Sequence, residues 1–254
     1  MTEENLSQIK EQVYKDPRPA EHFDRYHHRS RTTDPNWVYE AVRIATTLHA
    51  WIFFRTRGVA ADKVPARGPV ILAPNHFSFM DHFFMGVALR RKVRFMAKSQ
   101  LFKPPMEWIY SPGGVFPVRR GFADEEAFIT ARSILARGGA IAMYSEGGRS
   151  RTGKLAESVR PGIGRLALQS GATVVPIAIH GSSKVRNWKR LRFPKVTVLY
   201  GDPIRWDVVE EPTRDQQQAV ANEIFAEVRK LYAQLDAMGR RGVKAARRRE
   251  LRRA

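Results

Sequence analysis

Short apolar runs alternate with helical patterns along most of the chain after Gly58. The runs are largely continuous rather than alternating, which is expected of strands that are covered on both faces of a sheet. They lie at residues 70–74, 93–97, 115–118, 140–144, 173–179 and 196–200. We therefore expect these segments to form the buried strands of one domain.

The segments between these runs predict amphipathic helices. Residues 124–137 begin with acidic side chains and are followed by Gly138, which suits the helix dipole and a left-handed helix end. Further helices are expected at 161–169 and at 214–238, the latter behind a capping box from Thr213 to Gln216. Strands and helices in alternation indicate an α/β layered domain, with a mixed central sheet flanked by helices.

The N-terminal part of the chain divides into a polar stretch and an apolar helical one. Residues 1–36 are rich in His and Arg and are broken by prolines, which predicts a loosely ordered leader. Residues 37–54 carry an apolar stripe at helical spacing, formed by Trp37, Ala41, Ile44, Leu48, Trp51 and Ile52. This segment is well short of the roughly 20 apolar residues of a membrane-spanning helix. It fits either a helix that lies in a membrane interface or one that packs on the domain's own core.

Composition narrows the classes of chemistry and of partner. The 254 residues include no cysteine, which excludes disulfides, thiolate nucleophiles and zinc-thiolate sites. The formal net charge of +19 predicts a polyanionic partner, such as nucleic acid, an anionic bilayer or a phosphorylated substrate. The tail from Arg240 onward holds eight basic residues and one acidic residue, so +7 lies in the tail and +12 in the rest. Residues 1–15 are polar and of mixed charge, so we expect no signal peptide.

One histidine and one aspartate follow the first predicted strand of the main domain. The strand at 70–74 ends at Pro74, His76 lies on the turn, and Asp81 begins the next helix. Two residues five apart on a regular helix point in different directions, so these two meet only if the histidine precedes the helix. A carboxylate on one ring nitrogen leaves the other nitrogen as a general base. A second interpretation stays open, because Ser78 to Asp81 also matches a capping box in which Asp81 only satisfies backbone amides. His82 is a rival base that we expect to face solvent or its neighbours.

Two further strand ends carry arginines beside glycines. Residues 113–120 place a glycine pair before a short strand that ends in Arg119 and Arg120, and arginine is the preferred partner of phosphate. Residues 140–153 form a strand followed by a glycine-rich turn that displays Glu146, Arg149 and Arg151. An exposed basic strand end is the alternative for the first of these segments. A nucleotide-binding loop is excluded for the second, because neither glycine signature of such loops occurs at a strand-to-helix junction.

Four blocks in this order resemble the PlsC-type glycerolipid acyltransferase family, which includes bacterial 1-acylglycerol-3-phosphate acyltransferases. The blocks are Asn75-His76-x4-Asp81, Gly114-Val-Phe-Pro-Val-Arg119, Ser145-Glu146-Gly147-Gly148-Arg149-Ser150 and Val174-Val-Pro176-Ile177. The third block usually reads Pro-Glu-Gly-Thr-Arg in the family, whereas Ser145 and Gly148 stand at its proline and threonine positions here.

The resemblance implies a site and a reaction. It implies that His76 is the catalytic base and Asp81 its partner. The residues expected to bind substrate are Asn75, Ser78, Gly114, Arg119, Arg120, Glu146, Gly147, Gly148, Arg149 and Pro176. It implies an acyl-CoA or acyl-carrier-protein donor, direct attack without an acyl-enzyme, and a 1-acylglycerol-3-phosphate acceptor. Another lysophospholipid or a glycolipid is the alternative acceptor. We expect no cofactor and no metal.

The resemblance also divides the chain and implies its partners. Residues 1–57 are expected to form the leader and a membrane-interface helix, 58–238 the acyltransferase domain, and 239–254 a solvated basic tail. We expect an anionic membrane surface as a partner and a peripheral or monotopic position at the cytoplasmic face of the cell membrane. A non-catalytic nucleic-acid-binding protein is the alternative from another class. It lacks support from any RNA-binding aromatic signature, zinc finger or helix-turn-helix pattern, so no specific nucleic acid is expected.

Overall fold

The computed structural model describes residues 16–122, 124–150, 152–185 and 193–252. Within these residues seven strands form one sheet in the order β1-β7-β6-β2-β5-β3-β4. The strands are β1 (Arg57–Val59), β2 (Val70–Pro74), β3 (Arg94–Lys98), β4 (Val115–Val118), β5 (Ala140–Ala142), β6 (Thr173–His180) and β7 (Thr197–Tyr200). The strands from β6 to β4 in this order run parallel, β7 is antiparallel to β6, and β1 is parallel to β7. The predicted mixed sheet is confirmed.

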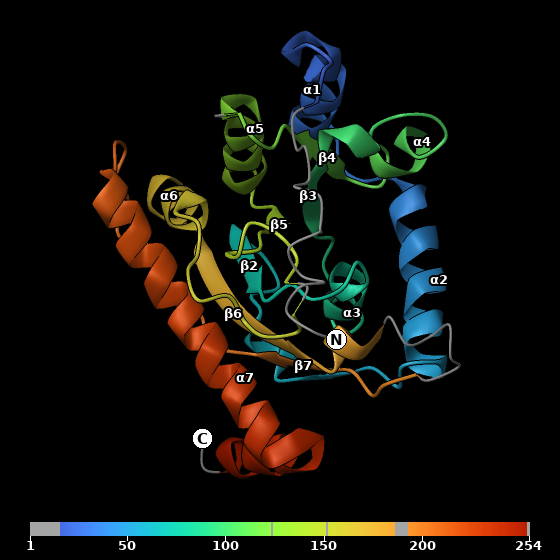
Figure 1. Ribbon diagram of the computed structural model, residues 1–254, viewed down its shortest axis with the longest axis vertical. Helices are drawn as coiled ribbons and strands as arrows, with labels where there is room; N and C mark the ends of the chain where they lie inside the picture. The colour runs from blue at the N-terminus through green and yellow to red at the C-terminus, as the bar shows by residue number, and fades with distance from the viewer. Residues whose placement is uncertain (1–15, 123, 151, 186–192, 253–254) are drawn as a thin grey trace, which may run out of the picture.

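Helices cover both faces of this sheet (Figure 1). They are α1 (Asp24–Thr32), α2 (Trp37–Ile52), α3 (Asp81–Gly86), α4 (Glu107–Tyr110), α5 (Glu125–Ala136), α6 (Gly162–Ser170) and α7 (Arg214–Leu251), with 3-10 turns η2 (Ala20–Phe23), η3 (Ala61–Lys63) and η4 (Ser99–Leu101). In β2, Ile71 and Ala73 pack in the core shared with α5, α6 and α7. Val70 and Leu72 pack on the other face, in the core shared with α2 and α3. The continuous apolar pattern of β2 therefore reflects burial on both faces.

Capping residues mark the ends of α5 and the start of α7 where the sequence predicts them. The Asp124 side chain accepts a hydrogen bond from the Ala127 amide at the start of α5, and Gly138 just after the helix has φ +76°. The Thr213 capping box starts α7. The short edge strand β1 was not predicted, because an exposed arginine and a glycine make up two of its three residues and leave no apolar run.

The N-terminal segment is ordered from residue 16 to residue 36. It forms η2 and α1, whose Phe23 and Tyr26 side chains are buried against Phe102. The prediction of a loosely ordered leader is wrong for these residues. Their two aromatic side chains pack against Phe102, which is far away in the sequence, so the local pattern does not reveal this contact. Residues 1–15 lie outside the described part.

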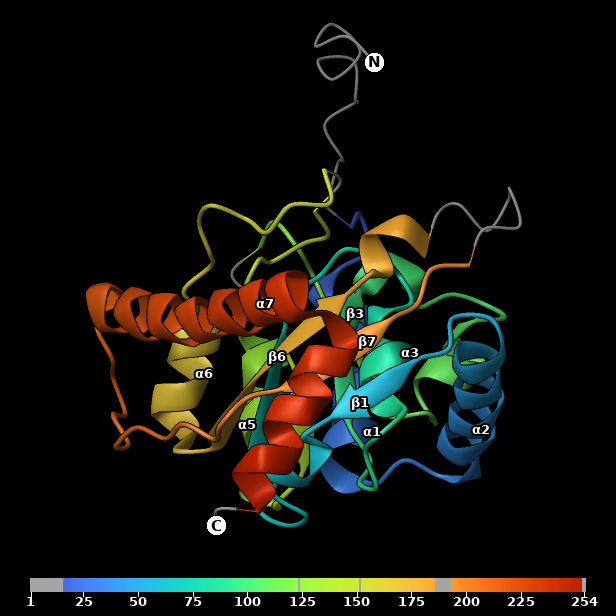
Figure 2. The same ribbon diagram turned by 90° about the horizontal axis from the view of Figure 1, so that it is seen from below.

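Helix α7 continues beyond Met238 and changes direction at Gly239, where φ is 60° (Figure 2). Val243 is only 4% exposed and packs with Val59, Leu199 and Leu235. The Arg240 guanidinium donates to Thr197 Oγ1 at 2.8 Å and to the Val196 carbonyl at 2.6 Å. The prediction of a solvated extension is therefore wrong for residues 239–252, which dock on the β1–β7 side of the sheet.

Candidate active site

The loops that follow the parallel strands β2, β5, β3 and β4 meet around a cavity of about 620 Å³. Such a position at the carboxyl ends of parallel strands is where α/β sheets usually bind ligands. Polar residues that line the cavity include His76, Tyr144, Arg120 and Arg149. Its apolar lining includes Val42, Phe79, Phe83, Phe95, Leu101, Met106, Ile109 and Val115. The cavity therefore combines two positively charged arginines and a histidine with an extended apolar lining.

His76 and Asp81 meet directly in this structure. His76 Nδ1 lies 3.0 Å from Asp81 Oδ2, and the same oxygen accepts the Phe77 and Ser78 amides at 2.7 Å each. Asp81 thus caps the turn and also binds the imidazole, so the two interpretations open from the sequence hold together. Asp81 is fully buried, and its Oδ1 has no hydrogen-bond partner among the described residues.

The surroundings of His76 favour a neutral imidazole. Burial lowers its pKa, and the positive charges of Arg149 and Arg120 act in the same direction against the opposing effect of Asp81. The Tyr144 ring stacks on the imidazole with centroids 3.9 Å apart and an interplanar angle of 23°. Because Nδ1 faces Asp81, Nε2 is the nitrogen left to accept a proton from a ligand in the cavity.

Of the ten predicted substrate-binding residues, Arg120 and Arg149 line the cavity and the other eight do not. Four of these eight have structural roles in the turns and strands around the cavity. Asn75 forms a reciprocal pair with Ile179, whose amide donates to Oδ1 at 2.7 Å and whose carbonyl accepts from Nδ2 at 3.2 Å. Ser78 lies in the turn, where its hydroxyl accepts the Met80 amide at 3.1 Å. Pro176 lies inside β6 opposite Ala73.

Gly114 is the fourth, and it has φ +84°. A Cβ atom there would come within 2.5 Å of Pro35 Cγ. This position therefore needs glycine for close packing of the N-terminal segment, not for contact with the cavity.

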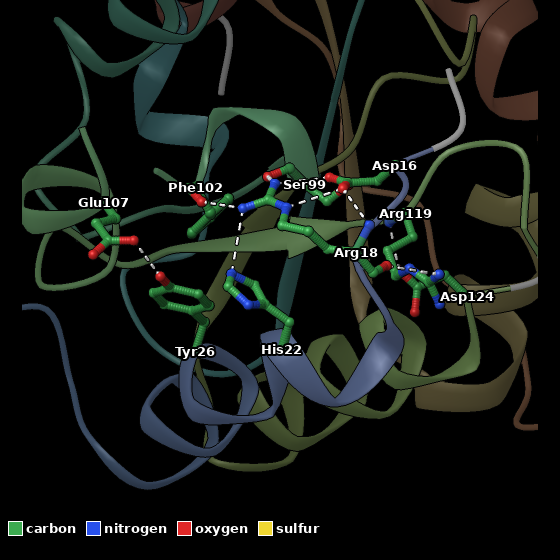
Figure 3. Close-up of polar contacts among 9 residues, drawn as sticks. All are labelled: Asp16, Arg18, His22, Tyr26, Ser99, Phe102, Glu107, Arg119 and Asp124. Carbon is green, nitrogen blue, oxygen red and sulfur yellow. Dashed lines mark hydrogen bonds and ion pairs between the residues drawn. The ribbon is translucent and has the colours of Figure 1, made fainter. Parts of the chain in front are cut away.

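The two adjacent arginines point in different directions. The Arg119 guanidinium lies 4.3 Å from the Phe122 ring centroid and donates to the Arg18 carbonyl at 3.3 Å. Its amide donates to Asp124 at 2.5 Å, as Figure 3 shows. Arg120 instead lines the cavity together with Arg149. β4 ends at Val118 and Arg120 lies in the turn that follows, where its side chain reaches the cavity and that of Arg119 does not.

The glycine-rich loop lies against the pair of His76 and Asp81. The Ser150 amide donates to the His76 carbonyl at 2.9 Å, and the Gly147 amide donates to the Tyr144 carbonyl at 3.1 Å. Gly147 has φ +67°, which closes the turn. Gly148 lies beside Arg120, whose Nη1 would be 3.9 Å from an added Cβ. Arg151 lies outside the described residues.

Glu146 in this loop carries a carboxyl group whose two oxygens are buried. Neither of its carboxylate oxygens has a hydrogen-bond partner among the described residues. Burial raises the pKa of Glu146 to about 7, and the negative charge of Asp81 adds to the effect. A proton on this group is therefore available near neutral pH.

Several lining residues were not predicted from the sequence. Tyr144 ends a buried run and carries no local signal of its contact with His76. His82 packs against the Phe79 and Phe83 rings, as expected for a residue that faces its neighbours, and burial lowers its pKa to about 3. Helix α2 supplies Tyr39, Val42, Arg43, Thr46 and Thr47 from the side opposite its apolar stripe. A helical wheel of residues 37–52 already separates these two faces.

The described residues offer neither a metal site nor a membrane-spanning helix. No cluster of three or more histidine, aspartate or glutamate side chains is placed to hold a metal ion among them. None of the helices described is both long and apolar enough to span a bilayer.

Comparison with known proteins gives consistent matches. Residues 56–180 match the family model described as Acyltransferase. A chloroplastic 1-acyl-sn-glycerol-3-phosphate acyltransferase of Arabidopsis thaliana is 26% identical over 147 residues, 56% of this chain and 41% of the relative. One from Brassica napus is 25% identical over 167 residues, 64% of this chain and 46% of the relative. The chain thus matches less than half the length of either curated relative.

A solved structure shares the fold. The 1-acyl-sn-glycerophosphate acyltransferase PlsC of Thermotoga maritima aligns with a TM-score of 0.58 at 21% identity. The alignment covers 83% of this chain and 88% of that one. The similarity extends well beyond residues 56–180 and includes most of the layered architecture.

Proposed function

Because residues 56–180 match the family model described as Acyltransferase, we propose that the chain is a PlsC-type acyltransferase. In this proposal it transfers a fatty acyl group from a thioester to the free hydroxyl of 1-acylglycerol-3-phosphate, giving phosphatidic acid. The observation that carries the proposal is the pair of His76 Nδ1 and Asp81 Oδ2, 3.0 Å apart at a cavity that also holds two arginines. This arrangement combines a general base with a site for an anionic acceptor.

Direct attack follows from these groups. His76 Nε2 takes the proton of the acceptor hydroxyl as its oxygen attacks the thioester carbonyl carbon. Asp81 stabilises the imidazolium that forms, because its charge lies against Nδ1. The tetrahedral intermediate collapses, the carbon–sulfur bond breaks, and the imidazolium returns its proton to the thiolate. This sequence consumes one thioester and one alcohol and yields one ester and one thiol.

The acceptor phosphate fits the basic part of the cavity. Arg120 and Arg149 line it, and a guanidinium offers phosphate paired, charge-assisted hydrogen bonds. Gly147 and Gly148 let the backbone of the loop approach the glycerol closely. We assign to Glu146 a role in holding this loop around the acceptor's glycerol, since its carboxylate oxygens are buried and the residue does not line the cavity. In this proposal Arg119 does not bind the acceptor, and its contacts with Phe122 and the Arg18 carbonyl hold the segment that carries Arg120.

The apolar lining fits the fatty acyl chain. A cavity of about 620 Å³ lies within the range of about 300–1,000 Å³ that is usual for small-molecule sites. Its side chains come from α2, α3, β3, η4 and α4, and most of them are aliphatic or aromatic. We propose acyl-CoA or acyl-carrier protein as the donor, with no cofactor.

The exposed face of α2 supports a membrane surface as partner. Trp37 is 74% exposed, and Ile44, Leu48, Trp51 and Ile52 are exposed along the same face. Only Ala50 of this helix is buried, so packing on the core does not explain the stripe. Leu101, Met106, Trp108 and Ile109, in and near η4 and α4, are exposed apolar side chains as well. We propose that this surface rests on an anionic bilayer at the cytoplasmic face of the cell membrane, as a peripheral or monotopic contact.

An acceptor panel tests the proposed function. Purified protein is given acyl-CoA or acyl-carrier protein with 1-acylglycerol-3-phosphate, other lysophospholipids and a glycolipid. We expect 1-acylglycerol-3-phosphate to give the highest kcat/KM. A preference for another acceptor would instead support the alternative that Ser145 and Gly148 raise, because they depart from the family's third block.

His76→Ala is the catalytic control in the same assay. We expect kcat to fall by roughly a hundredfold or more, because general-base catalysis contributes about 10²–10⁴ in rate. A folded variant as active as the parent would contradict the assignment of the base.

A further inference from the structure

Residues 16–36, here called the N-terminal strap, lie outside the segment that matches the family model, yet they contact the cavity wall. The wall consists of η4 and α4, which contribute Leu101, Met106, Ile109 and Tyr110 to the cavity lining. Neither element is long, since η4 spans three residues and α4 four. Such short elements have few internal hydrogen bonds and depend on neighbours for their position.

Two hydrogen bonds from the Arg18 guanidinium join the strap to the η4 turn (Figure 3). Its guanidinium donates to the carbonyls of Ser99 at 2.7 Å and Phe102 at 2.6 Å, at the two ends of the η4 turn. It also binds both carboxylate oxygens of Asp16, at 3.0 and 2.8 Å. Asp16 is only 3% exposed, and its hydrogen bond with Arg18 holds the pKa of its carboxyl group well below the usual range. The pair therefore stays charged and rigid in the folded chain.

A second contact joins the strap to α4. The Tyr26 hydroxyl donates to Glu107 at 2.5 Å in the first turn of α4. The Tyr26 ring lies 5.0 Å from the Phe102 ring, which in turn lies 5.9 Å from Tyr110 of the cavity lining. Phe23 and Phe102 are fully buried in the same cluster. Displacement of the strap would thus be transmitted to the cavity through packed rings.

The strap is also anchored independently of the wall. The buried Arg94 of β3 donates to the Ser30 carbonyl at 2.9 Å and to Asp34 at 2.9 Å. The Asn36 amide donates to the Pro112 carbonyl at 3.1 Å, just after α4. Because β3 is fixed in the sheet, the strap can hold η4 and α4 at a set distance from it.

We propose that the N-terminal strap fixes the η4–α4 wall of the cavity and that Arg18 is thereby a positioning residue that determines which acyl chain lengths the enzyme uses. This inference rests on the proposed function. Arg18 touches no substrate, and it acts through the backbone of η4. Without its clamp, η4 and α4 can move away from α2, and the cavity accepts longer chains and discriminates less between them.

Chain-length profiles test the inference. The full-length parent and Arg18→Ala are assayed with saturated acyl-CoAs of increasing length and one fixed acceptor. For Arg18→Ala we expect kcat/KM for long chains relative to the parent's preferred chain to rise by roughly tenfold, with the KM of the acceptor unchanged. Arg18→Lys keeps a charge beside Asp16 but lacks the planar fork, so its profile should lie between the two.

Two matched variants complete the design. Tyr26→Phe removes only the hydroxyl that binds Glu107 and should shift the profile in the same direction, so it decides the matter if Arg18→Ala does not fold. Arg29→Ala removes the same charge from an exposed position on α1 and should keep the parental profile.

The outcomes separate this inference from the proposed function. A parent that transfers no acyl group to any acceptor contradicts the proposed function. An active parent whose folded Arg18→Ala and Tyr26→Phe variants keep the parental profile, or lose activity equally for all chain lengths, overturns the strap's role. Hydrogen exchange gives a readout without catalysis: in Arg18→Ala the amides of residues 99–110 should exchange faster than in the parent, while those of α5 do not change. Unchanged exchange in that segment also overturns the role.

Discussion

Asp81 performs two tasks with a single oxygen atom. Its Oδ2 accepts two backbone amides of the turn and also contacts the imidazole of His76. The turn that shapes the start of α3 therefore also orients the proposed base. This arrangement explains how a carboxylate five residues after a histidine can contact it, although two residues at that spacing point in different directions within a regular helix.

Asp81→Asn separates the two tasks. The amide oxygen can still accept backbone hydrogen bonds, but the neutral group no longer stabilises an imidazolium. We expect kcat to fall by roughly a hundredfold or more while the KM of the acceptor changes little. Steady-state kinetics, with circular dichroism to confirm folding, measure this. A variant with near-parental kcat would show that the carboxylate charge has no part in the reaction.

Glu146 links the site to the pH dependence of stability. Its pKa is about 7 in the folded chain against 4.5 for an ordinary glutamate, so between these values the folded state binds one more proton than the unfolded state. The free energy of unfolding therefore decreases as pH rises through this window, by on the order of 3 kcal/mol in total. The loss is complete above the folded pKa and absent below the unfolded one.

Glu146→Gln should remove this pH dependence. We expect the variant to be more stable than the parent at pH values above about 7, and the difference to vanish at pH values below about 4.5. Chemical denaturation of the ligand-free proteins at both ends of this window measures the effect. A variant that is less stable than the parent under alkaline conditions would contradict the buried, unpaired state of the carboxyl group.

At the scale of elements, α2 serves as a wall with two working faces. One face supplies Tyr39, Val42 and Thr46 to the cavity, and the opposite face exposes its apolar stripe. A helix placed in this way separates the proposed acyl site from the proposed bilayer by a single layer of backbone. In the proposed arrangement the acyl site and the bilayer contact opposite faces of the same helix.

Ile44→Glu tests the role of the exposed face. A charge on this stripe should weaken binding to vesicles that contain anionic lipid by roughly tenfold or more, because an exposed apolar contact is replaced by a group that must stay hydrated. Cosedimentation measures binding, and activity on a water-soluble short-chain acceptor should be preserved. Val208→Glu is the matched control, since Val208 is 61% exposed and lies outside this surface. Equal binding by both variants would remove α2 from the membrane contact.

At the scale of the whole molecule, both ends of the described chain pack against the part that matches the family model, residues 56–180, or against the strands beside it. The strap packs along β3 and β4 at one side of the sheet, and the second arm of α7 packs along β1 and β7 at the other. The basic tail is consequently part of the folded surface. Its buried Arg240 and Val243 contacts are structural, whereas Arg241, Arg248, Arg249 and Arg252 are exposed.

Neutralising these exposed arginines tests whether the tail attracts anionic lipid. We expect the variant with all four changed to Gln to bind anionic vesicles at least tenfold more weakly at low salt and to lose the parent's strong salt dependence, since each basic residue near such a surface contributes about 1 kcal/mol. Substitution is preferable to truncation after Met238, because truncation also removes the packing of Val243. Vesicle binding over a salt series is the measurement. Identical salt curves for both proteins would exclude the tail from membrane attraction.

The sequence alone was sufficient for features that depend on near neighbours. Continuous apolar runs predicted buried strands, and caps such as Asp124 and Thr213 located helix ends, because these signals lie within a few residues of the structure they determine. The meeting of His76 and Asp81 could also be predicted, since a proline-terminated strand followed at once by a helix leaves few geometries for residues five apart.

Only the tertiary structure decided the features that join distant parts of the chain. The strand order brings the ends of β2, β5, β3 and β4 to one cavity, and this order determines that Tyr144 stacks on His76 and that Arg120 and Arg149 line the same site. Tertiary contacts also pair the Asn75 side chain with the backbone of β6 at Ile179. They order the strap, whose Phe23 and Tyr26 pack against Phe102. Such contacts depend on which surfaces become neighbours after folding, and local hydrophobic patterns carry no record of that choice.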